Sequence, residues 1–139
     1  MDTAVDSSVL WSIFKAELDS ADWLAVLHRC ASEGALVICE IVFAEVSPLF
    51  ETPETLCARL DALGIGIVPS GMKAWFLAGQ LFRQYRANGG PREHLIPDFL
   101  IGAHAQVQAQ RLAARDRGHL RRYFPNLVLV QPRVSSTHP

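Results

Sequence analysis

Segments predicted as strands and as helices alternate along the chain, and this alternation restricts the fold more than any other feature. Short apolar runs bounded by turn residues predict strands, which fall at Thr3–Val5, Leu36–Ile38, Ile65–Val68, Arg111–Arg115 and Asn126–Val130. Apolar residues at helical spacing predict helices. The first begins near Val9 after a cap at Ser7 or Ser8, and the next ones span Asp19–Ser32, Glu40–Phe50 and Pro53–Leu63. A long helix runs from a cap at Ser70 to Ala87, another runs from Pro97 towards Gln110, and a short one ends at Tyr123. The alternation predicts a three-layer α/β/α sandwich with a mostly parallel central sheet.

Length and composition predict one domain. A chain of 139 residues with 50% hydrophobic content can bury about two-thirds of its unfolded surface. We expect a single domain over residues 1–131. Residues 132–139 are mostly polar and include two prolines, so we expect them to form a loose C-terminal tail.

Cysteine usage and hydropathy favour a cytoplasmic protein. Cys30, Cys39 and Cys57 are odd in number and lack CxxC spacing, which predicts core thiols in a reducing compartment rather than a disulfide framework or a zinc site. We find no charged leader followed by an apolar run. The best apolar run, residues 35–46, is interrupted by two glutamates and is too short to span a bilayer. We therefore expect a soluble protein with no membrane partner.

The charges are divided unevenly between the two halves of the chain. Residues 1–69 contain 3 basic and 11 acidic side chains, whereas residues 70–139 contain 10 basic and 3 acidic ones. Arginines can bind phosphate groups bidentately, but a run of charges also occurs on ordinary solvated faces. Contact with nucleic acid is therefore one of two open interpretations of these arginines.

Two aspartates are predicted at the carboxyl ends of strands. Asp6 follows Thr3–Val5, and Asp116 follows Arg111–Arg115. Open parallel α/β sheets bind their ligands at this edge, and right-handed crossovers can bring the two strand ends together. For Asp6 the alternative is a role in capping the next helix.

Asp98 is predicted in the first turn of a helix, because Pro97 fixes φ and needs no amide partner there. Ile101, Gly102 and Ala105 follow at positions beneath Asp98, which makes this face narrow and lets another segment approach closely. An aspartate at this position can also serve only as a complement to the helix dipole.

Glu45 and Glu40 lie on the same predicted helix but in different surroundings. Glu40 falls in the first turn, where the helix dipole already stabilises a carboxylate. Glu45 lies mid-helix beside Ala44 and one turn beyond Ile41, where an inward carboxylate needs a partner or a metal. Five residues correspond to about 140° around a helix, so the two glutamates are not expected to face one site. Glu45 is the predicted site residue.

The predicted acids favour a particular cofactor. Three or four carboxylates in one crevice repel one another unless cations neutralise them. Mg²⁺ or Mn²⁺ suits such an oxygen-only site, whereas the lack of clustered histidines and cysteines argues against zinc. The predicted ligands are Asp6, Glu45, Asp98 and Asp116.

The segments around these acids resemble a known family. AVDSSVL around Asp6, EIVFAEV around Glu45, IPDFLIGAHA around Asp98 and ARDRGHLRRYFP around Asp116 are similar, in order and spacing, to the four acidic motifs of PIN-domain ribonucleases, specifically VapC-type toxins of type II toxin–antitoxin systems. The resemblance covers nearly the entire chain. One departure is Ala114, since the family commonly has threonine two residues before the last aspartate.

The resemblance implies a metal-dependent RNA endonuclease in which one or two divalent ions activate a water molecule. The four acids would be its catalytic and metal-binding residues. Ser8 is a candidate hydroxyl that supports them, and the candidate RNA contacts are Arg115, Arg121 and Arg122. The resemblance also implies a homodimer, neutralised by a cognate antitoxin that occupies the active-site groove.

Two other classes of function stay open at this point. A metal-dependent phosphohydrolase would have a second aspartate two residues after the first, where this chain has Ser8. A PIN-like module that binds RNA or protein without cutting would have its acids too far apart to share a metal. Incubation of the metal-free protein with RNA, with and without Mn²⁺, distinguishes these classes.

Overall fold

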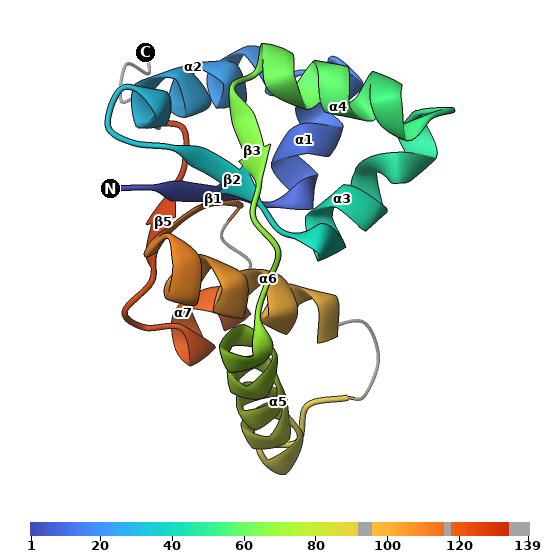
Figure 1. Cartoon of the computed structure of the whole chain (residues 1–139). Coiled ribbons are helices and arrows are strands. Elements are labelled where there is room, and N and C mark those ends of the chain that lie inside the picture. The colour runs from blue at the N-terminus through green and yellow to red at the C-terminus, as the bar shows by residue number, and fades with distance from the viewer. Residues whose placement is uncertain (92–95, 116–117, 134–139) are drawn as a thin grey trace.

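A parallel sheet forms the centre of the protein (Figure 1), which we describe from a computed structural model over residues 1–91, 96–115 and 118–133. Within these residues the sheet has five strands in the order β3-β2-β1-β4-β5. Their bounds are Thr3–Val5 (β1), Leu36–Ile38 (β2), Ile65–Ile67 (β3), Arg111–Ala113 (β4) and Val128–Val130 (β5). All neighbouring strands run parallel, so their carboxyl ends share one edge of the sheet.

Helices cover both faces of this sheet, as the sequence predicts. In Figure 1, α1, α2, α3 and α4 lie on one side, and α5, α6 and α7 lie on the other. Their bounds are Ser7–Phe14 (α1), Ser20–Ala31 (α2), Glu40–Val46 (α3), Pro53–Ala62 (α4), Met72–Ala87 (α5), Ile96–Gln108 (α6) and His119–Tyr123 (α7), with a 3₁₀ turn at Ser47–Leu49 (η1). None of the helices in the described part of the chain has both the length and the apolar character needed to cross a membrane.

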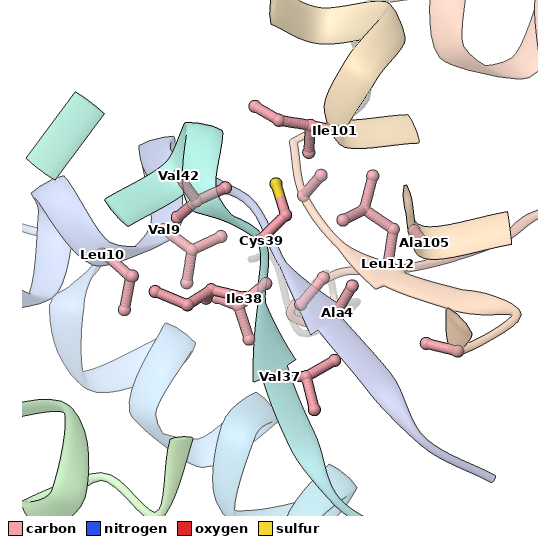
Figure 2. Packing of buried hydrophobic residues seen from close by; sticks show 14 of the residues in the cluster. Ala4, Val9, Leu10, Val37, Ile38, Cys39, Val42, Ile101, Ala105 and Leu112 are labelled. Carbon is pink, nitrogen blue, oxygen red and sulfur yellow. The ribbon is translucent and has the colours of Figure 1, made fainter. Parts of the chain in front are cut away.

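The core consists of two apolar layers separated by the sheet (Figure 2). Val9 of α1 and Val42 of α3 pack on one side of β2, and Ile101 and Ala105 of α6 lie near Leu112 of β4. Strands β1 and β2 are buried along their whole length, as expected when both faces of a parallel sheet are covered. The central strands are therefore fixed from both sides.

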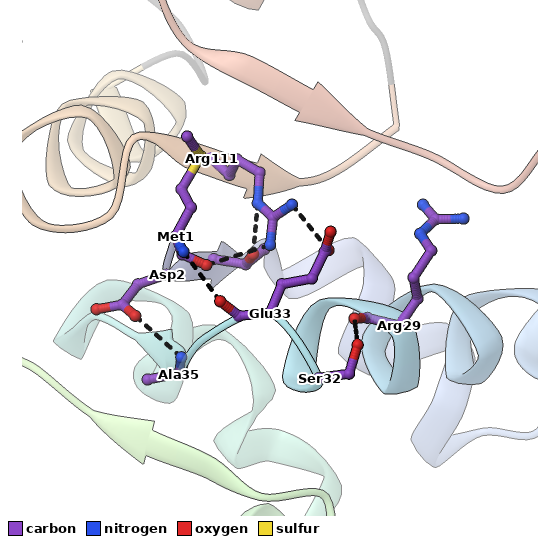
Figure 3. A network of polar contacts seen from close by, with 8 residues as sticks. Met1, Asp2, Arg29, Ser32, Glu33, Ala35 and Arg111 are labelled. Carbon is purple, nitrogen blue, oxygen red and sulfur yellow. Dashed lines mark hydrogen bonds and ion pairs between the residues drawn. The ribbon is translucent and has the colours of Figure 1, made fainter.

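Polar contacts join the amino ends of β1 and β4 (Figure 3). The guanidinium of Arg111 donates to the hydroxyl of Thr3 at 2.9 Å, to the Met1 carbonyl at 3.2 Å and to a carboxylate oxygen of Glu33 at 3.0 Å. Thr3 is fully buried, so Arg111 supplies a partner for a hydroxyl that water cannot reach. This network lies at the opposite edge of the sheet from Asp6.

The helix predicted over Glu40–Phe50 is shorter than expected. Helix α3 ends at Val46, and the chain continues as the 3₁₀ turn η1 before it becomes extended at Phe50. Pro48 explains the difference, because proline has no amide hydrogen with which to continue the α-helical hydrogen-bond pattern, although Ser47 before it keeps an α conformation. The Ser47 hydroxyl also donates to the Phe43 carbonyl at 2.7 Å.

Ser70 does not cap the fifth helix, contrary to the sequence-based prediction. The cap position of α5 is Gly71, with no hydrogen bond from a capping side chain, and the helix begins at Met72. The backbone amide of Ser70 instead donates to the carboxylate of Glu40 at 2.8 Å. Ser70 therefore links the chain before α5 to the start of α3.

The apolar side chains of α5 are only partly buried. Ala78 is buried, and Phe82 and Tyr85 pack against the core. Trp75 is 53% exposed and lies near the exposed Phe76.

The three cysteines predicted as core thiols differ in burial. Cys30 and Cys39 are buried, whereas Cys57 is only half-buried.

Candidate active site

Asp6 lies directly after β1, at the carboxyl edge of the sheet, and is 5% exposed. Its extended backbone makes it the N-cap of α1, and its Oδ2 accepts from the Ser8 amide at 3.4 Å and from the Ser8 hydroxyl at 2.5 Å. The prediction that Ser7 or Ser8 caps this helix is therefore wrong. Asp6 combines the strand-end position with the capping role that was its alternative, and Ser8 contacts it as expected.

Glu45 is half-buried on α3 and contacts α1 through both its side chain and its main chain. The Ser7 hydroxyl donates to Glu45 Oε1 at 2.9 Å, and the Trp11 indole N–H donates to the Glu45 carbonyl at 3.1 Å. Since Ser7 is the residue next to Asp6, the first turn of α1 contacts Glu45 with one serine and Asp6 with the next. Sequence reasoning missed Ser7, although its spacing of four from Trp11 places both on one face of a helix.

Asp98 is half-buried in the first turn of α6, a helix that packs against β1, β4 and α3. The narrow face predicted beneath it is buried, with Gly102 against the ring of Phe124. A methyl group on Gly102 would lie 2.5 Å from that ring. The small residue therefore lets α6 approach closely, as the sequence predicts.

Asp116, the fourth predicted acid, lies outside the described residues. The strand before it ends at Ala113, earlier than predicted, and is joined to the Asp6 amide by a hydrogen bond of 2.9 Å. Ala114, at the family's usual threonine position, is fully buried. It therefore brings no hydroxyl to this part of the sheet edge.

Arg115, a predicted phosphate contact, pairs with Asp19 at 2.6 Å between Nη2 and Oδ2. Asp19 also accepts from the Ser12 hydroxyl and, at 3.1 Å, from the Trp23 indole. The Ser12 hydrogen bond, together with Trp23 and Arg115, holds the pKa of Asp19 below its usual range. Arg115 and Asp19 lie 96 positions apart along the chain, so no local pattern predicts their pairing.

The other two predicted RNA contacts lie on α7. Arg121 and Arg122 are both exposed. The Arg122 guanidinium lies over the Tyr123 ring at 5.5 Å from its centroid, and Arg121 lines a shallow hollow with Phe124 and Pro125. Both cations are therefore presented at the protein surface.

Glu40 contacts a different set of residues from Glu45. It accepts from the Ser70 amide and lies near His104 of α6, whose Nε2 is 2.6 Å from the Val68 carbonyl oxygen. Burial opposes ionisation of Glu40, but its hydrogen bonds outweigh that effect and lower its pKa. Burial also lowers the pKa of His104. The two glutamates of α3 thus have separate partners, as their spacing predicts.

The predicted acids and the hydroxyls that contact them are chemically suited to a hard divalent cation. They are the carboxylates of Asp6, Glu45 and Asp98 with the supporting hydroxyls of Ser7 and Ser8, and oxygen ligands of this kind are preferred by Mg²⁺ and Mn²⁺. Within residues 1–91, 96–115 and 118–133, no three His, Cys, Asp or Glu side chains are close enough to share an ion. Asp116 is not among the residues to which that statement applies.

Several solved structures have a similar fold. A chain of VapBC2 from Rickettsia felis bound to a promoter DNA fragment is 22% identical, with a TM-score of 0.73 over 94% of this chain and 98% of that chain. VapBC-1 from nontypeable Haemophilus influenzae is 13% identical, with a TM-score of 0.67 over 94% of this chain and 98% of that chain. FitAcB from Neisseria gonorrhoeae is 18% identical, with a TM-score of 0.63 over 91% of this chain and 95% of that chain. A search of curated protein sequences finds no match.

These similarities concern the fold, and the family is established by the sequence itself. Residues 3–125 match the PIN domain family. This segment begins with β1 and contains Asp6, Glu45, Asp98 and Asp116. By this match, which extends over most of its length, the chain belongs to the PIN domain family.

Proposed function

We propose that this PIN domain is the toxin of a toxin–antitoxin pair and that it hydrolyses RNA phosphodiester bonds with a carboxylate-bound Mg²⁺ or Mn²⁺. The observation that carries the proposal is the support of two acids from separate elements, Asp6 and Glu45, by consecutive serines of one helical turn. A carboxylate held by hydroxyl donors at a sheet edge is a preorganised ligand. Family membership supports nuclease chemistry at this edge.

In this proposal the ion would be held by Asp6, Glu45, Asp98 and Asp116. When bound, it would supply an activated water and stabilise the charge that develops on the phosphodiester. The Ser8 hydroxyl keeps the buried carboxylate of Asp6 oriented. Arg115, Arg121 and Arg122 would bind backbone phosphates on either side of the cut, since guanidinium groups match phosphate geometry.

Two partners belong to the same proposal. The solved structures of similar fold are VapBC and FitAB-type complexes, which supports a cognate antitoxin as the natural inhibitor. A second copy of the chain is the other partner. The exposed Met72, Trp75 and Phe76 at the start of α5 support a dimer face there, because apolar patches of this kind commonly mark interfaces.

The decisive experiment compares Glu45→Gln with Glu40→Gln. Glu45→Gln should raise the Mn²⁺ concentration needed for half-maximal RNA cleavage, because an amide is a poorer ligand than a carboxylate. Glu40→Gln should leave that concentration unchanged and should lower helix stability by about 0.3–1 kcal/mol through loss of the charge near the helix N-terminus. Purified protein is titrated with Mn²⁺ against an RNA pool, and the cut ends are mapped.

The reverse result, in which only Glu40→Gln alters the metal requirement, would contradict the site assignment. Absence of cleavage by the parent protein at any Mn²⁺ concentration would instead favour a PIN module that binds RNA or protein without cutting.

A further inference from the structure

Helix α1 contacts Glu45 at two points that lie one helical turn apart. Ser7 donates its hydroxyl to the Glu45 carboxylate at 2.9 Å, and Trp11 donates its indole N–H to the Glu45 carbonyl at 3.1 Å. Residues four apart lie on the same face of a helix, so both contacts to Glu45 come from one face of α1. The contacts bridge 38 and 34 positions of sequence, so they are tertiary contacts and not local turn chemistry.

We propose that Ser7 is a positioning residue, which orients the carboxylate of Glu45 for the divalent cation. This inference rests on the proposed function, in which Glu45 is a ligand. A glutamate side chain has several rotatable bonds and loses conformational freedom when a metal captures it. A hydroxyl that already donates to Oε1 fixes the rotation of the carboxylate before the ion arrives, as supporting hydrogen bonds commonly do around metal ligands.

The two consecutive serines divide this work between two acids. Ser8 donates to Asp6, and Ser7 donates to Glu45. Adjacent residues point about 100° apart around a helix, so one serine could not reach both carboxylates. Asp6 caps the same helix, and the first turn of α1 therefore sets the relative placement of two predicted ligands. Trp11 adds a main-chain contact that fixes the distance between α1 and α3.

The test is direct binding of Mn²⁺ to the metal-free protein without RNA, measured as the loss of the electron paramagnetic resonance signal of the free ion. Ser7→Val and Ser7→Thr form the matched pair, since the two side chains have similar shapes and only threonine retains a hydroxyl. We expect Ser7→Val to weaken Mn²⁺ binding about 10-fold and Ser7→Thr to stay near the parent, because loss of a supporting hydrogen bond typically weakens metal binding 10- to 100-fold.

Ser47→Ala is the control for loss of a serine hydroxyl in the same region. Ser47 donates to the Phe43 carbonyl at the end of α3, and its removal should leave Mn²⁺ affinity unchanged. Circular dichroism and urea unfolding check that each variant is folded. Should Ser7→Val fail to fold, Ser7→Ala replaces it in the comparison with Ser7→Thr.

Glu45→Gln separates this inference from the proposed function. Weakened Mn²⁺ binding in both Glu45→Gln and Ser7→Val, with recovery in Ser7→Thr, supports both proposals. Weakened binding in Glu45→Gln together with parent-like binding in Ser7→Val overturns the role of Ser7 and leaves the metal site standing. Parent-like binding in Glu45→Gln overturns the assignment of Glu45 and, with it, the role of Ser7.

Discussion

Gly102→Ala should destabilise the protein although the same change in an ordinary helix stabilises it. Gly102 lies within α6, and a Cβ built on it would be 2.5 Å and 2.7 Å from two carbons of the Phe124 ring. Carbon atoms pack best at about 3.5–4.0 Å, so the ring would have to withdraw by about 1 Å. Phe124 is 1% exposed and contacts the ring of Phe99, with 6.2 Å between centroids, so it cannot move without displacing its neighbours.

The magnitude follows from two opposing effects. Alanine improves on glycine in a helix by about 1 kcal/mol, whereas overpacking a core costs about 1–3 kcal/mol. The rigid surroundings of Phe124 place the overpacking cost at the upper end of that range, about 2–3 kcal/mol. We therefore expect Gly102→Ala to lower the free energy of unfolding by about 1–2 kcal/mol. Gly79→Ala is the matched control on α5, where a Cβ meets nothing within 4 Å, and it should raise the free energy of unfolding by about 0.5–1 kcal/mol.

Urea unfolding measures both variants through their midpoints and slopes. Measurement of parent and variant at two protein concentrations reveals whether Gly79 lies in a dimer contact, because the replacement would then change how strongly the unfolding midpoint depends on concentration. In a Phe124→Leu background, Gly102→Ala should cost less than it does alone. Equal stabilisation by both glycine replacements would refute the close packing of α6 on Phe124.

The remaining predictions concern pH and RNA binding. Burial lowers the pKa of His104 below 6.5, so the unfolded chain binds a proton at His104 more readily than the folded protein does. The free energy of unfolding should therefore be highest above about pH 7 and fall as the pH drops through 6.5. Urea midpoints measured from about pH 7 to pH 5 should show this fall for the parent and a weaker one for His104→Gln, and equal slopes would exclude His104 as the cause. Arg115→Gln should flatten the dependence of log RNA affinity on log salt by about 0.7 if Arg115 exchanges Asp19 for a phosphate. An unchanged slope in salt titrations, beside a flattened one for Arg122→Gln, would leave Arg115 as a partner of Asp19 alone.

The elements that the sequence predicted correctly are those set by local patterns. The apolar runs at Thr3–Val5 and Leu36–Ile38 become strands with the expected bounds. Asp6 follows its strand and Asp98 falls in the first turn of its helix, because strand ends and proline-marked helix starts depend on neighbouring residues. The narrow face at Gly102 also follows from helical spacing alone.

The features that the sequence did not reveal depend on residues distant along the chain. Serine is a common helix cap, but the Ser70 amide donates a hydrogen bond to the carboxylate of Glu40 on another helix. Glu40 itself had a sufficient local explanation in the helix dipole, which concealed its proximity to His104. Arg115 lies two residues after β4 and pairs with Asp19, the residue before α2, across 96 positions of sequence. Helical periodicity carries no information about such contacts.

The position of β1 in the middle of the sheet also determines when the chain can fold. Ala4 pairs with Val37 on one side and with Leu112 on the other. The first strand to be synthesised can therefore complete its pairing only after one of the last strands has been synthesised. Contacts between residues this far apart in sequence close slowly because of their loop entropy. During synthesis the Asp6 amide therefore has no Ala113 carbonyl to bond until residues 111–113 have left the ribosome. A nascent chain that stops before that point lacks half of the pairing around its central strand, and the edge that carries Asp6 is assembled only when translation of the domain is nearly complete.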